Sequence, residues 1–335
     1  MEGNIVHKWQ VPIEQYWDTA NAQNRGFNPQ LAHVGWRAAK ALPNGDLIFI
    51  AIAYRSPWGL AMVRVDKDSR VIWSYLKNAH HDFDIGDDGR IYLLTHDIIQ
   101  TAPKGLEFLD MPAFDERINI LSPDGKELYE FSLLEAIGRS KYKEVLLKGG
   151  ETNMKGDLLH TNTVKVIGPS FARHAPFARE GQVALFFREK NALAIFDLKE
   201  EKIVWAKTGF GKGAHDPDFL DNGQILLFDN KGLSNGWSRV VFMDSKNFNI
   251  LRSIEGHPDR PFVSAIRSRQ QWLPNGNVMI TESDTGRLFE VSQTDEIVWE
   301  YVNPVRRSVN GKTYVPVIMG GVRYRADDLK FLNQS

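Results

Sequence analysis

Three histidines stand at the starts of predicted strands, and two of them have the same distance to a turn glycine. His81 lies eight residues before Gly89, His215 lies eight residues before Gly223, and an aspartate follows each histidine. His160 opens the corresponding strand of the segment between them. Near neutral pH an imidazole can serve as a nucleophile, as an acid or base, or as a metal ligand. Equal offsets on equivalent strands predict that these side chains lie at one level of the fold.

Two fixed distances along the sequence from the turn glycines identify further polar residues. Eight residues before a turn glycine lie Arg37 and Ser268. Seven residues after a turn glycine, where the returning strand reaches the same end, lie Arg188 and His96. We therefore expect Arg188 to lie beside His160. An arginine among histidines favours an anionic substrate, because the planar guanidinium matches an oxyanion.

Two kinds of β-hairpin recur along the chain and would position these residues. In the first kind, alternating apolar residues flank a polar turn, and the second strand ends in an aromatic residue. Its copies end at Trp73, Tyr129, Trp205 and Trp299, with a degenerate copy at Leu251 and a half copy at Trp9. The second kind turns at Asn-Gly or Asp-Gly, which suit type I′ turns with two positive φ angles. These turns are Asn44-Gly45, Asp88-Gly89, Asn222-Gly223 and Asn275-Gly276, with a weaker Glu180-Gly181.

One hairpin of each kind makes a four-stranded blade, so the repeat predicts an all-β fold, a six-bladed β-propeller. The sixth blade would combine the C-terminal stretch 311–318 with the N-terminal strand 5–9. This pairing would close the ring and leave no open sheet edge. We expect one domain over residues 1–335, with a helical or loop insertion at about 132–150.

Composition narrows the class of protein. The 335 residues are 42% hydrophobic and 25% charged, which is enough for a full buried core. The net charge of −1 gives no basic surface for nucleic acid, and no apolar run is long enough to span a membrane. Cysteine is absent, which excludes disulfides and thiolate chemistry. The chain as written carries no export signal and would be cytoplasmic; an export or anchor segment before it would make it periplasmic.

Four stretches of the chain resemble the bacterial aryl-sulfate sulfotransferase family. They are HHDFDIGDDGRIYLLTHD, DLLHTNTVKVI, HDPDFLDNGQILLFDN and QQWLPNGNVMITESDTGRLFEVSQTDEIVWEY, and they extend from His80 to Tyr301. The resemblance implies a six-bladed propeller that moves a sulfuryl group from a phenolic sulfate to a phenol without a nucleotide donor. Characterised members also carry an extra N-terminal β-domain and an export signal, which this sequence does not show.

The resemblance also implies roles for the residues selected above. His215 would be the histidine that is transiently sulfated. His81 and His160 would assist it as acid, base or cation. Asn162 and Arg188 would complete the catalytic group, and the arginine would hold the sulfuryl oxygens.

Four residues are expected to bind substrate around this group: Arg37, His96, Arg267 and Ser268. The implied partners are a small phenolic sulfate and a phenol. No metal or other cofactor is needed for this chemistry, and the oligomeric state is not predicted.

Two other functions remain open from the residues alone. Three imidazoles on converging strands could bind Zn²⁺ or Fe²⁺, which would indicate a metal-dependent enzyme of the lyase or lactonase type. Alternatively, the propeller could be a binding module without catalytic activity.

Overall fold

The computed structural model describes residues 3–28, 33–53, 59–144 and 155–333. The described residues form two compact units. The first unit comprises Met1–Asp97, Arg117–Glu130 and Tyr324–Ser335. The second unit comprises Ile98–Glu116 and Phe131–Arg323. The single domain expected from the sequence over residues 1–335 stays a prediction.

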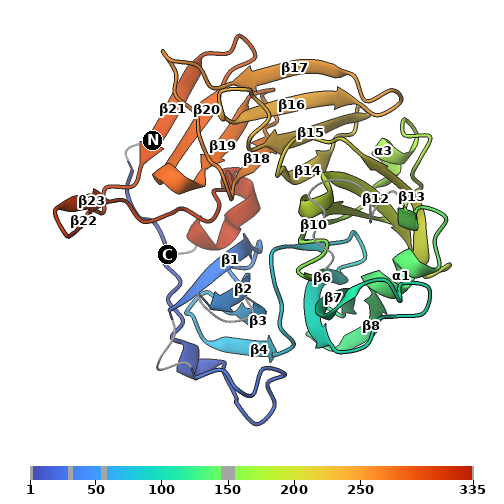
Figure 1. The fold of residues 1–335 in the computed structure, drawn as a ribbon. Coiled ribbons are helices and arrows are strands. Elements are labelled where there is room, and N and C mark those ends of the chain that lie inside the picture. Colours follow the sequence, from blue (N-terminus) through green and yellow to red (C-terminus); the bar gives the residue numbers. More distant parts are fainter. Residues whose placement is uncertain (1–2, 29–32, 54–58, 145–154, 334–335) are drawn as a thin grey trace. The chain divides into compact units, whose positions relative to one another are not determined.

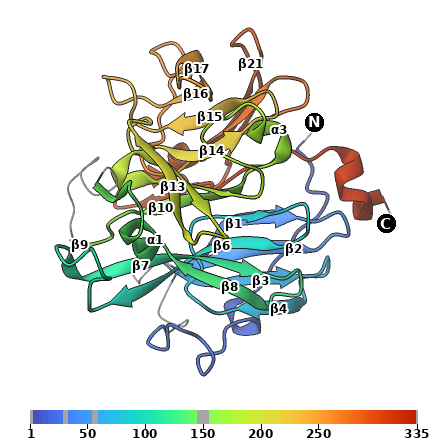
Figure 2. The ribbon, with the colours of Figure 1, turned by 90° about the vertical axis from the view of Figure 1, so that its right-hand side faces the viewer.

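The first unit contains a four-stranded antiparallel sheet in chain order. Its strands are β1 (Val34–Ala41), β2 (Leu47–Ala53), β3 (Gly59–Val65) and β4 (Val71–Tyr75), which Figure 2 shows side by side. The inner strands β2 and β3 are almost wholly apolar, since both of their faces are buried. The unit also holds two 3₁₀ segments, η1 (Ile13–Gln15) and η4 (Ala326–Asn333).

The strands of the second blade are divided between the units. They are β5 (Phe83–Ile85), β6 (Ile91–Ile99), β7 (Asp110–Leu121) and β8 (Glu127–Ser132). Within the first unit, β5 pairs antiparallel with β6, and Phe83 and Leu93 pack against Ile50. Within the second unit, β9 (Lys155–Gly156) pairs in parallel with β7.

Three further four-stranded antiparallel sheets belong to the second unit (Figure 1). The third blade has β10 (Thr161–Val166), β11 (Val183–Phe187), β12 (Ala192–Asp197) and β13 (Lys202–Thr208). The fourth has β14 (His215–Phe219), β15 (Gln224–Asp229), β16 (Arg239–Asp244) and β17 (Ile250–Glu255). The fifth has β18 (Arg269–Trp272), β19 (Val278–Glu282), β20 (Arg287–Val291) and β21 (Ile297–Val302). Short helical segments join some strands: α1 (Leu133–Gly138), α3 (Pro169–Ala172), η2 (Arg188–Lys190) and η3 (Ser283–Thr285).

The core of the second unit lies between its sheets, and strand β15 shows how the sequence builds it. Ile225 and Leu227 pack with side chains of the third blade, such as Phe186. The alternate residues Leu226 and Phe228 pack with side chains of the fifth blade. Because neighbouring side chains of a strand point to opposite faces, an inner strand must be apolar at every position to fill both interfaces.

The number of blades differs from the prediction: the described residues form five blade sheets, not six. The proposed N-terminal strand is absent, since residues 3–12 form no strand and Ile5 is 84% exposed. Of the proposed C-terminal stretch, only β23 (Lys312–Tyr314) is a strand, and it pairs with β22 (Arg307–Val309) in a separate hairpin. Trp9 instead donates to the carbonyl of Gly45 at 3.1 Å. The half copy of the repeat therefore packs against a turn of the first blade and does not extend a sheet.

The glycine turns form the predicted hairpins but with a different turn type. Gly45, Gly89, Gly223 and Gly276 have positive φ angles, whereas the residue before each of them does not. Each glycine N–H bonds to the carbonyl three residues earlier, for example Gly223 to Leu220 at 2.9 Å. This pattern fits a type I turn followed by a left-handed glycine, so the type I′ expectation was wrong.

The insertion expected at about 132–150 contains helix α1. Ser132 caps this helix, since its hydroxyl accepts from the Glu135 amide at 3.0 Å. Residues 139–142 form turns and a bend after the helix, residues 143–144 are helical, and residues 145–150 lie outside the described residues. The part of the prediction that concerns residues 145–150 therefore stays a prediction.

Candidate active site

His215 begins strand β14 after a glycine-rich loop, and its side chain is buried. Its Nδ1 lies 3.0 Å from the carbonyl oxygen of Gly213 and 2.8 Å from Oδ1 of Asn230. The Asn230 amide nitrogen donates to the carbonyls of Ser264 at 2.6 Å and Arg267 at 2.8 Å. These two bonds establish which end of the amide carries oxygen.

The two neighbours of Nδ1 determine where the imidazole of His215 carries its proton. Both the Gly213 carbonyl and the Asn230 Oδ1 are acceptors, so Nδ1 must be the donor. In the neutral ring the lone pair then belongs to Nε2. Nε2 is therefore the atom that can act as a nucleophile.

His160 lies directly before β10 with a left-handed φ of 50°. Its Nδ1 makes a hydrogen bond to Oδ2 of Asp157. Asn162 joins the starts of two blades, because its amide nitrogen donates to the carbonyl of Ala214, the residue before His215, at 2.8 Å. The starts of β10 and β14 are thus held together within the second unit.

A second carboxyl group lies behind the His160–Asp157 pair. Glu116 is buried and accepts from the Thr161 amide at 2.9 Å and from the Thr161 hydroxyl at 2.5 Å. Burial, together with the nearby charge of Asp157, raises the pKa of Glu116 to about 8. Near neutral pH this carboxyl is therefore mostly protonated.

Arg188 follows β11 and lies beside His160, as the spacing predicts. Its amide donates to the carbonyl of His160 at 3.2 Å, and its Nη1 pairs with Glu189. Its Nε is buried and has no hydrogen-bond partner within the described part of the chain. A Cβ atom placed on Gly213 would lie 4.0 Å from both Nε and Nη2. The guanidinium therefore lies next to the loop that carries His215.

Arg267 and Ser268 lie just before β18, and Asn230 connects them to His215 through the Arg267 carbonyl. Ser268 is 5% exposed, and its hydroxyl has no hydrogen-bond partner among the described residues. Its φ of 148° is rare for a residue with a side chain. The Arg267 guanidinium lies 3.5 Å from Asp284. A buried donor without a partner suits a hydroxyl that contacts a substrate.

The first unit holds the other histidines of the prediction. His81 has a left-handed φ of 52°, and its Nδ1 lies 2.8 Å from Nδ1 of His80. The Nε2 of His80 lies 3.0 Å from the carbonyl of Thr95 and must donate to it. In the neutral pair, His80 Nδ1 therefore accepts from His81 Nδ1, and the lone pair of His81 belongs to Nε2. His96 is buried in β6, with its ring centre 5.1 Å from that of His80.

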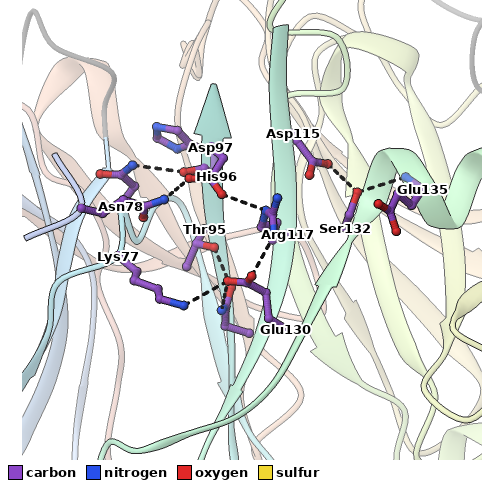
Figure 3. A network of polar contacts seen from close by, with 12 residues as sticks. Lys77, Asn78, Thr95, His96, Asp97, Asp115, Arg117, Glu130, Ser132 and Glu135 are labelled. Atoms are coloured by element: carbon purple, nitrogen blue, oxygen red, sulfur yellow. Dashed lines mark hydrogen bonds and ion pairs between the residues drawn. The ribbon is translucent and has the colours of Figure 1, made fainter. Parts of the chain in front are cut away.

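A polar network of the first unit holds the strand that carries His96 (Figure 3). Asn78 donates to the His96 carbonyl at 3.1 Å. Arg117 pairs with Asp97 at 3.2 Å and with Glu130 at 2.8 Å. These contacts hold β6 in place, and they leave His96 as a buried side chain next to His80.

The two units thus contain different parts of the predicted site. The second unit brings together His160, Asn162, Arg188, His215, Arg267 and Ser268. The first unit contains Arg37 in β1, together with His81 and His96.

The counts from the turn glycines did not select His80, Asp157 and Asn230, which contact the histidines, or Glu116, which binds Thr161 next to His160. The sequence does contain a signal for Asn230, because this residue lies seven residues after Gly223. The same offset from a turn glycine selects Arg188 and His96. Within the described residues, no three His, Asp or Glu side chains are grouped so that they could hold a metal ion. No helix in the described ranges is both long and apolar enough to cross a membrane.

Several solved structures are similar to this chain. A protein of unknown function from Bacteroides caccae has a TM-score of 0.52 at 12% identity, covering 80% of this chain and 81% of that chain. Virginiamycin B lyase from Staphylococcus aureus has a TM-score of 0.43 at 11% identity, covering 81% and 71%. The WD40 β-propeller domain of Doa1 has a TM-score of 0.44 at 11% identity, covering 79% of each chain. At such identities the likeness to the first of these concerns the fold alone.

Sequence comparison gives the family. No curated protein sequence matches the chain. Residues 38–304 match the family described as arylsulfotransferase (ASST), and this range includes every predicted site residue except Arg37. The match covers most of the 335 residues. The chain therefore belongs to the arylsulfotransferase (ASST) family and is an enzyme of that type.

Proposed function

We propose that the protein moves a sulfuryl group from a phenolic sulfate ester to a phenolic acceptor through a sulfohistidine at His215, without a nucleotide donor. The observation that carries the proposal is the pair of acceptors on Nδ1 of His215, which leaves the lone pair on Nε2. Family membership supports the class of reaction. The guanidinium of Arg188 beside the same loop supports an anionic substrate.

In the first half of the reaction, Nε2 of His215 attacks sulfur. The N–S bond forms, the bond from sulfur to the phenolic oxygen breaks, and its electron pair leaves with that oxygen. His160 in its cationic form gives the Nε2 proton to the phenolate, so phenol departs. Asp157 accepts from Nδ1 of His160 and stabilises its cationic form.

In the second half, the incoming phenol replaces the first one. Neutral His160 takes the proton of the phenol hydroxyl, and the phenolic oxygen forms a bond to sulfur. The N–S bond breaks, and its electron pair returns to Nε2 of His215. Both histidines then have their starting protonation, so the cycle is balanced.

The remaining groups would stabilise charge on the sulfuryl oxygens. The Nε of Arg188 and the hydroxyl of Ser268 are both buried, and neither has a hydrogen-bond partner among the described residues. Such fixed donors stabilise charge at little reorganisation cost. His81 belongs to the first unit, and its assisting role stays a prediction.

The first test is the intact mass of the protein after brief incubation with 4-nitrophenyl sulfate. A gain of about 80 Da that disappears on adding phenol is expected for a sulfuryl adduct on a histidine. The variant His215→Asn should show neither the adduct nor release of 4-nitrophenol. The control His257→Asn, at an exposed histidine, should behave like the unchanged protein.

Two outcomes would contradict the proposal. An adduct that persists in His215→Asn would mean that another group is the nucleophile. No adduct and no release, with a tightly bound metal found by elemental analysis, would favour a metal-dependent enzyme.

A further inference from the structure

We propose that Asn230 is a positioning residue for this reaction: its side chain sets the tautomer of His215 and ties that histidine to the residues before β18. The inference rests on the proposed role of His215 as nucleophile. It concerns a residue that contacts His215 and need not contact the substrate.

Asn230 is fully buried directly after β15, and all of its side-chain polar atoms are engaged. Oδ1 lies 2.8 Å from His215 Nδ1, and Nδ2 donates to Ser264 and Arg267. Its own carbonyl accepts from the hydroxyl of Ser238 at 2.8 Å. A flipped amide would direct its oxygen at two carbonyls and its NH₂ at Nδ1, so the observed orientation is the one that satisfies every group.

The contact with Asn230 decides which nitrogen of His215 can react. If the proton moved to Nε2, the lone pair of Nδ1 would face the Gly213 carbonyl and the Asn230 Oδ1 at close range. The reactive tautomer, with Nδ1 protonated, is therefore favoured. The same acceptors become stronger partners when Nε2 attacks sulfur, because the ring then gains positive charge.

The place of Asn230 in its blade supports a role in the site. It lies seven residues after Gly223, as Arg188 lies seven residues after Gly181. Both residues follow the second strand of a blade and so stand at the same end of equivalent sheets. Through the Arg267 carbonyl, Asn230 also holds the backbone that leads into Ser268. One amide thus couples the nucleophile to the substrate-binding residues of the next blade.

The test compares Asn230→Ala with Ser238→Ala. Ser238 donates to the Asn230 carbonyl and accepts from the Ser264 amide at 2.9 Å, so its removal disturbs the same loop without touching His215. For 4-nitrophenyl sulfate, Asn230→Ala should lower kcat/KM roughly ten- to a hundredfold with little change in KM. Ser238→Ala should change kcat/KM less than about threefold. An equal loss in both variants would show that Asn230 only supports the loop.

The tautomer itself can be measured without turnover. With ¹⁵N-labelled histidine, the NMR signals of His215, assigned by their loss in His215→Asn, should show a proton on Nδ1 at mildly alkaline pH. In Asn230→Ala the signals should shift toward a mixture of the two tautomers. A proton on Nε2 in the unchanged protein would overturn the inference, even if the sulfuryl adduct is found. If the adduct is absent but the Nδ1 proton is present, the proposed function fails and the positioning contact stands.

If Asn230→Ala does not fold, the variant Asn230→Asp provides a second test. Its carboxylate still accepts from Nδ1 but cannot donate to Ser264 and Arg267. A negative charge at this distance favours the cationic imidazole, so the acid limb of the pH–rate profile should move to higher pH. An unchanged profile would contradict direct contact with the nucleophile.

Discussion

His81, His160 and His215 share one local arrangement, although they belong to three different blades. In each, Nδ1 faces a fixed neighbour: His80, Asp157 or Asn230. In the neutral ring, each neighbour leaves the lone pair on Nε2. The neighbours differ in chemical type, and in the proposed mechanism this difference would separate the roles of the histidines. A neutral amide suits a nucleophile, whereas a carboxylate stabilises the cationic form that an acid catalyst needs.

Replacing Asp157 tests the role of His160 as an acid. In Asp157→Asn the cationic form of His160 loses its carboxylate partner, so protonation of the leaving phenolate should suffer. We expect kcat/KM to fall roughly tenfold or more for phenyl sulfate and much less for 4-nitrophenyl sulfate, whose leaving group needs little protonation. The measurement is kcat/KM for a series of aryl sulfates of increasing phenol basicity.

A carboxylate of the same unit provides the control for this series. Asp197 accepts from Gln182 and from the Lys199 amide but contacts none of the site histidines. Asp197→Asn should leave the dependence on leaving group unchanged. If Asp157→Asn slowed all donors by the same factor, Asp157 would not act through proton transfer.

The first strands of three blades have irregular pairing at the predicted site residues, and this irregularity helps to position those side chains. The register shifts between His215 and Asp218 in β14 and between Thr161 and Thr163 in β10. It also shifts between Trp36 and Ala39 in β1, next to Arg37. A bulge turns a side chain away from the regular alternation of a strand. The same device therefore recurs at the start of several blades.

A matched pair of glycine substitutions tests how closely a hairpin turn packs against its neighbours. Gly223 and Gly181 have similar φ angles, 81° and 78°. A Cβ on Gly223 would lie 2.4 Å from Cβ of His174, whereas a Cβ on Gly181 would meet nothing within 4 Å. Both alanine variants should lose about 1 kcal/mol from the positive φ angle, and Gly223→Ala should lose roughly 1–3 kcal/mol more from the clash. Urea unfolding measures both, and equal losses would contradict the close packing at Gly223.

The hairpin signals in the sequence predicted the β-propeller architecture of the whole molecule but not the number of its blades. Every strand pair with its own turn signal formed, because a hairpin needs only neighbouring residues. The sixth blade required the two ends of the chain to pair, but the C-terminal stretch formed a hairpin of its own from β22 and β23. Trp9 instead found partners on a turn and on Phe331. Sequence spacing cannot distinguish these outcomes, because both bury the same aromatic side chain.

The same limit explains which site residues could be predicted. His160, Arg188 and Ser268 stand at fixed distances from turns or at strand starts, so the repeat itself reveals them. Asp157 lies only three residues before His160, in a segment without a turn signal, whereas Glu116 reaches Thr161 from 45 residues away through the tertiary fold. Their importance follows from burial and charge, which no pattern in the sequence displays.

Buried Glu116 should make the stability of the whole molecule depend on pH. Its pKa is raised from 4.5 to about 8, because burial and the charge of Asp157 disfavour ionisation. A carboxyl whose pKa is higher in the folded state stabilises the fold fully at acid pH, and this contribution is lost as the pH rises through the folded pKa. We therefore expect the free energy of unfolding to fall between about pH 5 and about pH 9.

Glu116→Gln isolates this contribution, because an amide does not ionise. Relative to the unchanged protein, the free energy of unfolding of the variant should rise with pH, on the order of a few kcal/mol across this range. The measurement is urea unfolding at several pH values from about 5 to about 9. Glu180→Gln, at an exposed glutamate, is the control and should follow the unchanged protein. If the free energy of unfolding of Glu116→Gln also ran parallel to that of the unchanged protein, Glu116 would have the same pKa in the folded and the unfolded state, which would contradict the prediction.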